Sequence, residues 1–240
     1  MIEKGRILSH VKQTPPPSRV PDTRFASLRC RMVEAQLAAH GIADSRVLDA
    51  MGRVPREQFV LPEMRDAAYE DGPLPIGCGQ TISQPFTVAF MCEALRLDGT
   101  EKVLEIGAGS GYSAAVLSLL AKSVFTIERV PELAEQARSR LAELGYDNVH
   151  VVTGDGTLGL SCEGPFDAIV VTAGAETLPD TYVQQLRMGG RIVIPIGEYR
   201  YNQEMYRFTR LDGDLRVESL GGFAFVPLIG KYGWHGPMED

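Results

Sequence analysis

The sequence predicts an α/β protein with a doubly wound, mostly parallel Rossmann-like sheet, an antiparallel C-terminal edge and an N-terminal helical appendage. In the central part of the chain, short apolar runs alternate with helical patterns, which favours parallel strands joined by right-handed crossovers. The first of these runs leads into a turn with three glycines, the usual start of a nucleotide-type site in such sheets. Near the C-terminus the helical patterns stop, and consecutive apolar runs predict antiparallel strands.

Composition limits the classes of function. The chain has 240 residues, of which 44% are hydrophobic, enough for one large domain with a real core. The net charge is −7 and no basic run occurs, so we expect no nucleic-acid or membrane partner. The four cysteines show no zinc spacing, no apolar stretch approaches the ~20 residues of a membrane span, and the N-terminus lacks an apolar signal core. We therefore expect a cytoplasmic monomer without a metal.

The first part of the chain divides into two segments. Residues 1–22 are polar and proline-rich, which predicts a flexible extension outside the fold. Residues 23–98 are predicted to form an N-terminal helical segment that includes a Pro- and Gly-rich loop. The helices expected there run from Phe25 to about Gly41, from Ser45 to Met51 and from Pro85 to Leu95, with the loop over residues 62–79.

The core is predicted over residues 99–232, with residues 233–240 as a tail. Apolar runs predict parallel strands at Lys102–Ile106, Val124–Ile127, Val149–Val152, Phe166–Thr172 and Arg191–Ile196. Helical patterns between them cover Ser113–Ala121, Pro131–Leu144 and Pro179–Leu186. After them we expect a hairpin, Gln203–Arg210 with Leu215–Leu220, closed by a turn at Asp212–Asp214, and a last strand at Phe223–Ile229.

The glycine-rich turn after the first core strand is the strongest indication of a ligand. Glu105 lies near the end of that strand, and Gly107, Gly109 and Gly111 follow at every second position. We expect all four residues to bind the ligand. Glycines let the backbone turn tightly and approach a ligand closely. The third glycine comes one residue earlier than in the dinucleotide fingerprint, with Tyr112 in its usual place. The turn therefore suits an adenosyl group without a pyrophosphate better than NAD, although a turn that binds nothing stays an alternative.

Acidic residues close the next two strands. Glu128 lies 17 residues beyond Gly111, near the ~20 expected for a carboxylate that binds a ribose, and Arg129 follows it. Asp155, with Gly156 after it, could accept a hydrogen bond from an adenine amino group. The alternatives are a solvated acid for Glu128 and a helix N-cap for Asp155. Glycines and acids at successive strand ends together favour a cofactor site.

The segment just before the first core strand makes the prediction specific. It reads Gly77-Cys78-Gly79-Gln80-Thr81-Ile82-Ser83-Gln84-Pro85, and from about Phe25 to Gly230 the chain resembles the protein-L-isoaspartate O-methyltransferase family, within the class I S-adenosylmethionine-dependent methyltransferases. That family carries G-x-G-Q-T-I-S-Q-P here, whereas generic methyltransferases do not. Further matches include Val54-Pro55-Arg56, Pro73-Leu74-Pro75-Ile76 and Phe225-Val226-Pro227-Leu228. The proline-rich extension and the tail depart from the pattern.

The resemblance implies S-adenosyl-L-methionine as cofactor and methyl transfer to the α-carboxylate of L-isoaspartyl residues in damaged peptides and unfolded protein segments. It places Gln80, Thr81, Ile82 and Ser83 against both cofactor and substrate. A carboxylate, with a pKa near ~4, is ionised at neutral pH, so rate must come from its placement and from excluding water. Ser83 is the expected holder of that carboxylate, and its alternative role is the N-cap of the helix at Pro85.

Two rival functions stay open at this stage. A member of the same family could methylate a normal aspartate in one dedicated precursor peptide, and the extension and the altered tail are the only hints of this. A protein that binds S-adenosylmethionine without turnover would belong to a different class.

Overall fold

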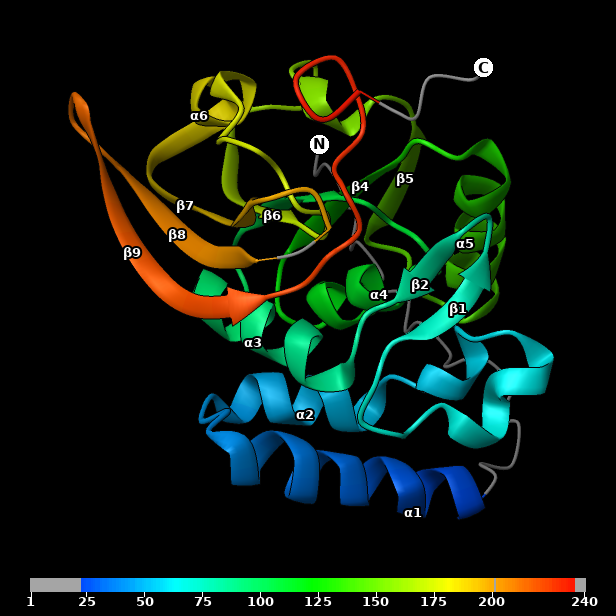
Figure 1. The fold of residues 1–240 in the computed structure, drawn as a ribbon. Coiled ribbons are helices and arrows are strands. Elements are labelled where there is room, and N and C mark those ends of the chain that lie inside the picture. The colour runs from blue at the N-terminus through cyan, green and yellow to red at the C-terminus, as the bar shows by residue number, and fades with distance from the viewer. Residues whose placement is uncertain (1–22, 201, 236–240) are drawn as a thin grey trace, which may run out of the picture.

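The computed structural model describes residues 23–200 and 202–235, so the expectation for residues 1–22 lies outside the described part. A seven-stranded sheet forms the centre, in the order β5-β4-β3-β6-β7-β8-β9 (Figure 1). The strands are β3 Lys102–Ile106, β4 Ser123–Glu128, β5 Val149–Thr153, β6 Phe166–Val171, β7 Leu186–Gly197, β8 Gln203–Leu211 and β9 Asp214–Phe223. The first five in chain order are parallel, and β8 and β9 are antiparallel, as predicted.

Side chains of the central parallel strands β3 and β6 are buried on both faces, which explains their nearly continuous apolar sequences. In β3, Val103 packs into the core on one face and Leu104 into the core on the other. The first face carries α3 Pro85–Leu95, α4 Tyr112–Ser118 and α5 Pro131–Glu143, and the opposite face carries α6 Asp180–Gln185. The sheet is therefore the middle layer of three, and the ends of its strands, not its faces, are left for ligands.

The N-terminal helices stack on the helical layer, far from the sheet (Figure 1). α1 covers Thr23–Met32 and continues through a π-helical turn, Val33–Leu37, and a 3-10 turn, Ala38–His40, to Gly41. Gly41 has φ +101°, a left-handed value that glycine adopts without strain and that ends the helix as predicted. α2 Ser45–Arg53 begins at Asp44, whose side chain accepts from the Arg46 N–H.

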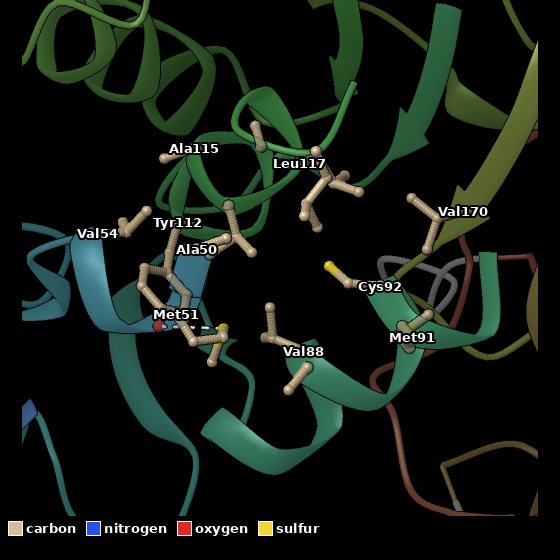
Figure 2. Close-up of a cluster of buried hydrophobic side chains, with 14 of the residues drawn as sticks. Ala50, Met51, Val54, Val88, Met91, Cys92, Tyr112, Ala115, Leu117 and Val170 are labelled. Carbon is tan, nitrogen blue, oxygen red and sulfur yellow. Dashed lines mark hydrogen bonds between the residues drawn. The ribbon is translucent and has the colours of Figure 1, made fainter. Parts of the chain in front are cut away.

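Where α2, α3 and α4 meet, the core closes around Tyr112 (Figure 2). Its hydroxyl lies 3.7 Å from the Met51 sulfur, and the buried Arg56 guanidinium stacks over its ring at 4.9 Å. Burial raises the pKa of Tyr112 to about 12, so its hydroxyl stays protonated at neutral pH. Tyr112 follows Gly111 directly, and this packing ties the glycine-rich turn to the N-terminal helices.

The Pro- and Gly-rich stretch contains a hairpin that the sequence did not predict. β1 Leu74–Gly77 pairs antiparallel with β2 Gln80–Ile82 around a tip at Cys78. Gly77 and Gly79 flank the tip with φ values of +93° and +66°. The hairpin joins the N-terminal helical segment to α3 (Figure 1).

The predicted last strand, Phe223–Ile229, is wrong beyond its first residue. Phe223 ends β9, and the chain then leaves the sheet and crosses the loop after β6. The Gly174 N–H donates to the Val226 carbonyl at 2.8 Å, and the Leu228 N–H donates to the Gly174 carbonyl at 2.8 Å. Because that loop takes up the backbone groups, they do not extend the sheet. Smaller differences are an earlier start of β7, at Leu186, and an earlier end of α4, at Ser118.

Candidate active site

A pocket of about 240 Å³ lies at the carboxyl ends of β3 and β6, where the chain order in the sheet reverses. Ligands of open α/β sheets bind at such switch points. Six segments supply most of its wall: Gly79–Ser83, Gly107–Ser110, Glu128–Val130, Thr172–Ala173, Tyr199–Arg200 and Val226–Ile229. The hairpin, the glycine-rich turn and the C-terminal segment, far apart in sequence, therefore meet at one site.

The glycine-rich turn requires glycine because its backbone has left-handed φ values and leaves no room for a Cβ at Gly107. Gly107 has φ +100°, and a Cβ there would collide with the Thr172 hydroxyl, which donates to the Gly107 carbonyl at 2.8 Å. Gly109 has φ +52° and donates its N–H to Glu128 Oε2 at 2.8 Å. Gly111, with φ +89°, is the N-cap residue of α4 and lies against Leu141, outside the pocket wall. Two of the three predicted glycines thus face the pocket, and the third packs the helix behind it.

Glu128 is the acidic group of the pocket. The residue is 7% exposed, and its carboxylate accepts one N–H on each oxygen, from Gly109 at 2.8 Å and from Val130 at 2.9 Å. A carboxylate oxygen can accept more than one bond, so both keep capacity for the hydroxyls of a ligand. Arg129, beside it, lines the pocket and is exposed.

Glu105, although predicted as a cofactor residue, lies in β3 beneath the turn and not in the pocket wall. It is fully buried and accepts from the Thr126 hydroxyl at 2.6 Å. Burial raises the pKa of Glu105 to about 7, against the opposing effect of hydroxyls from Thr126 and Ser113. The hydrogen bond with Thr126 joins β3 to β4.

The loop after the hairpin tip supplies the opposite wall. Gln80, Thr81, Ile82 and Ser83 all line the pocket, and their contact with cofactor and substrate stays a prediction. The N-cap of α3 is Gln84, without a side-chain capping bond, so the alternative role of Ser83 as the helix cap is wrong. Within the described part of the chain, the Ser83 hydroxyl has no hydrogen-bond partner and is free to bind a ligand.

Asp155 and Gly156 lie outside the pocket wall. Asp155 caps the 3-10 turn Gly156–Leu158 by accepting from the Thr157 N–H at 2.9 Å, and it also accepts from the Lys231 N–H at 2.8 Å. Burial opposes its charge, but the N–H groups of Lys231 and Thr157 outweigh burial and lower the pKa of Asp155. The structure thus shows the capping alternative, and an adenine contact stays a prediction.

Several pocket residues were missed by the sequence reasoning. Thr172 and Ala173 follow the fourth core strand, so their position at a strand end was an available signal. Val226, Pro227 and Leu228 belong to a stretch that the family resemblance already contained. Tyr199 and Arg200 reach the pocket from the β7–β8 turn, and no sequence signal pointed to them.

Fold and pocket together define the class of a doubly wound α/β protein that binds an adenosyl-type cofactor at its switch point. The chain belongs to the protein-L-isoaspartate(D-aspartate) O-methyltransferase family, whose model matches residues 29–233. Within the described residues, no helix is long and apolar enough to cross a membrane. No three His, Cys, Asp or Glu side chains in that same part are grouped to hold a metal ion.

Relatives support the assignment along nearly the whole chain. Protein-L-isoaspartate O-methyltransferase of Syntrophus aciditrophicus is 53% identical over 216 residues, which cover 89% of this chain and 99% of that protein. Protein-L-isoaspartate O-methyltransferase 2 of Marinobacter nauticus is 55% identical over 88% of this chain and 96% of that protein.

Solved structures agree with the sequence relatives. One protein-L-isoaspartate O-methyltransferase superposes with a TM-score of 0.77 at 32% identity, over 85% of this chain and 67% of that chain. A Plasmodium falciparum structure, described as a candidate for the same enzyme in complex with S-adenosyl-L-homocysteine, superposes with a TM-score of 0.72 at 27% identity. It covers 84% of this chain and 98% of that chain.

Proposed function

We propose that this chain transfers the methyl group of S-adenosyl-L-methionine to the α-carboxylate of L-isoaspartyl residues and so initiates their repair. One observation carries the proposal beyond family membership. The Gly79–Ser83 loop, whose match to the family is the most specific, forms one wall of the same pocket whose other wall is the glycine-rich turn with Glu128. A hydroxyl for the acceptor and a carboxylate for the cofactor therefore share one cavity.

The pocket fits the cofactor chemically. Glu128 retains acceptor capacity on both oxygens for ribose hydroxyls, and Gly107 and Gly109 present backbone without side chains. Gln80, Thr81 and Arg129 are the other polar side chains proposed to hold it. Bound there, S-adenosyl-L-methionine supplies a methyl group that its sulfonium already makes electrophilic.

The residues of the chain have a limited chemical task. The acceptor carboxylate is ionised at neutral pH, so the site needs no strong base. Ser83 donates its free hydroxyl to that carboxylate and orients it. Ile82, Val88 and Met91 line the pocket with apolar surface, which limits the access of water.

Repair follows from the chemistry of the product. The methyl ester is a better electrophile than the carboxylate, because its methoxy group can leave. The following backbone nitrogen attacks the ester carbonyl, loses its proton and displaces methanol, which forms a succinimide. The succinimide opens partly to normal aspartate, and repeated cycles drive repair. This sequence requires a mobile backbone at the acceptor, and so the proposed substrates are isoaspartyl peptides and unfolded protein segments.

The test compares an isoaspartyl peptide with its aspartyl twin, using radiolabelled S-adenosylmethionine. We expect methyl incorporation into the isoaspartyl peptide alone. Equal labelling of both peptides would contradict the proposal. Labelling of a single aspartyl precursor would favour the peptide-maturation alternative, and cofactor binding without any turnover would favour a binding protein.

A further inference from the structure

One wall of the pocket is built from two segments that share a buried anchor. The side chain of Gln203, 2% exposed, donates to the Glu198 carbonyl at 3.1 Å and accepts from the Phe225 N–H at 2.7 Å. It thereby fixes the β7–β8 turn and the C-terminal segment to each other. Figure 1 shows this segment, in red, running past the turn after it leaves β9. The two segments therefore form a single rim.

Aromatic packing extends this rim outward. The ring of Tyr199 meets the Trp234 ring edge to face, with centroids 5.4 Å apart. Trp234 is held in turn by its indole N–H, which donates to the Gly174 carbonyl at 3.1 Å. Trp234 lies in the segment that the sequence assigned to a tail, yet it supports the mouth of the pocket.

Arg200 sits on this support without an ion pair to any residue that the structure describes. Its guanidinium stacks over the Tyr199 ring at 5.5 Å, and its backbone has a left-handed φ of +68°. Within residues 23–200 and 202–235, no carboxylate pairs with Arg200, and Asn202 engages the carboxylate of Glu198 at 3.2 Å. An arginine keeps its charge at all physiological pH values, so a fixed positive charge lines the pocket.

This charge contrasts with the rest of the molecule, whose net charge is −7. A positive spot at the mouth of a pocket in an acidic protein attracts anions locally. Resting on the proposed function, we propose that Arg200 is a specificity-determining residue that favours isoaspartyl peptides with an acidic residue beside the isoaspartate.

The position of Arg200 favours a neighbouring residue over the reacting carboxylate itself. Arg200 is exposed at the rim, whereas Ser83 is half-buried in the wall supplied by a different segment. A peptide whose isoaspartate enters the pocket must pass its flanking residues over the rim. A flanking carboxylate can therefore pair with Arg200 without leaving solvent.

The experiment measures kcat/KM for three isoaspartyl peptides that carry Glu, Ala or Lys on both sides of the isoaspartate. For the unmodified enzyme we expect the order Glu, Ala, Lys, with steps of about two- to five-fold, the size of one exposed ion pair. Arg200→Glu should reverse the order. Arg216→Glu is the matched control, because it changes the net charge equally from an exposed site on β9 outside the pocket, and it should preserve the order. High salt should flatten the differences.

Two results would overturn the inference. One is a peptide order unchanged by Arg200→Glu. The other is an equal loss of kcat on all three peptides, which would place Arg200 on the reacting carboxylate. The Ala peptide and its aspartyl twin report on the proposed function separately. If the isoaspartyl form is still preferred while the flank order is flat, only the role of Arg200 fails; if that preference is absent, both proposals fail.

Discussion

At the scale of single residues, removal of the Ser83 hydroxyl should lower the rate of catalysis without lowering stability. Because α3 is capped at Gln84 and Ser83 has no described protein partner, Ser83→Ala removes no hydrogen bond from the fold. It should lower kcat by ~10²–10³-fold, the usual cost of losing one preorganised donor, or less if other donors share the carboxylate. Initial rates and thermal melts check this, with Ser83→Thr as the variant that keeps the hydroxyl. A shifted melt with an unchanged kcat would contradict the assignment.

Glu128 and Asp155 should respond differently to the same substitution. Glu128→Ala should weaken binding of S-adenosyl-L-homocysteine by about 1.5–3 kcal/mol, the range for hydrogen bonds to a charged group. Asp155→Ala should instead cost about 0.5–2 kcal/mol of stability, as loss of a cap does, because its oxygens are bound to Thr157 and Lys231. Calorimetry and chemical denaturation on both variants separate the two roles. An equal loss of cofactor affinity in both variants would show that Asp155 also binds the cofactor.

Glu105 should make stability depend on pH. Its pKa is raised by burial to about 7 in the fold, from 4.5 in the unfolded chain. Between these values the folded protein holds a proton that the unfolded chain has lost, so the free energy of unfolding falls as pH rises. The full loss, reached above pH 7, is on the order of 3 kcal/mol.

The measurement is the difference in free energy of unfolding between the unmodified chain and Glu105→Gln, taken from pH 5 to pH 8. The variant has the same shape and does not titrate, so its advantage should grow across that window. Parallel curves would mean that Glu105 does not titrate there.

At the scale of elements, the side chain of Gln203 should contribute strongly to the free energy of unfolding, because it joins two segments. Gln203→Ala leaves the buried Phe225 N–H without its acceptor and frees the β7–β8 turn. We expect a loss of about 2–4 kcal/mol in the free energy of unfolding, since an unsatisfied buried donor costs ~1–3 kcal/mol by itself. Chemical denaturation measures it, with Gln136→Ala on the exposed face of α5 as the control. Equal stabilities of the two variants would refute the anchor.

Elements were predictable where the local pattern determines the structure. The parallel strands were found because each is a short apolar run between turn residues, and β3 at the centre is buried on both faces, as Val103 and Leu104 show. The segment after Phe223 has the same apolar character, but its backbone bonds to Gly174 instead of a strand. Apolar composition alone does not say which partner will take the backbone groups, and this is why the last strand was predicted wrongly.

At the scale of the whole molecule, some residues of the candidate site were predictable from local sequence and others were not. Gly107, Gly109 and Glu128 could be assigned from their positions at strand ends, which a parallel sheet brings to one edge. Tyr199 and Arg200 reach that edge only because β7 runs on to Gly197 and turns there. Their place depends on tertiary structure, and a rim of this kind must be read from the fold.

Deletion of residues 1–22 tests whether stability and activity depend on the N-terminal extension. The family model begins at residue 29, and 89% of this chain matches 99% of the Syntrophus relative. Deleting residues 1–22 should therefore leave the free energy of unfolding within about 0.5 kcal/mol and kcat/KM within about two-fold. Deleting residues 231–240 should instead lower both, because it removes the Trp234 indole and the Lys231 N–H from Gly174 and Asp155.

A shorter deletion, residues 236–240, is the control for the C-terminal cut, because it keeps Trp234 and Lys231. Melts and rates on the isoaspartyl peptide and its aspartyl twin should be recorded for all three deletions. If removal of residues 1–22 abolished turnover on one dedicated aspartyl precursor while the fold stayed intact, the extension would be a substrate-binding arm. The peptide-maturation alternative would then replace general repair, since a catalyst for scattered damage has no need of an arm that recognises one partner.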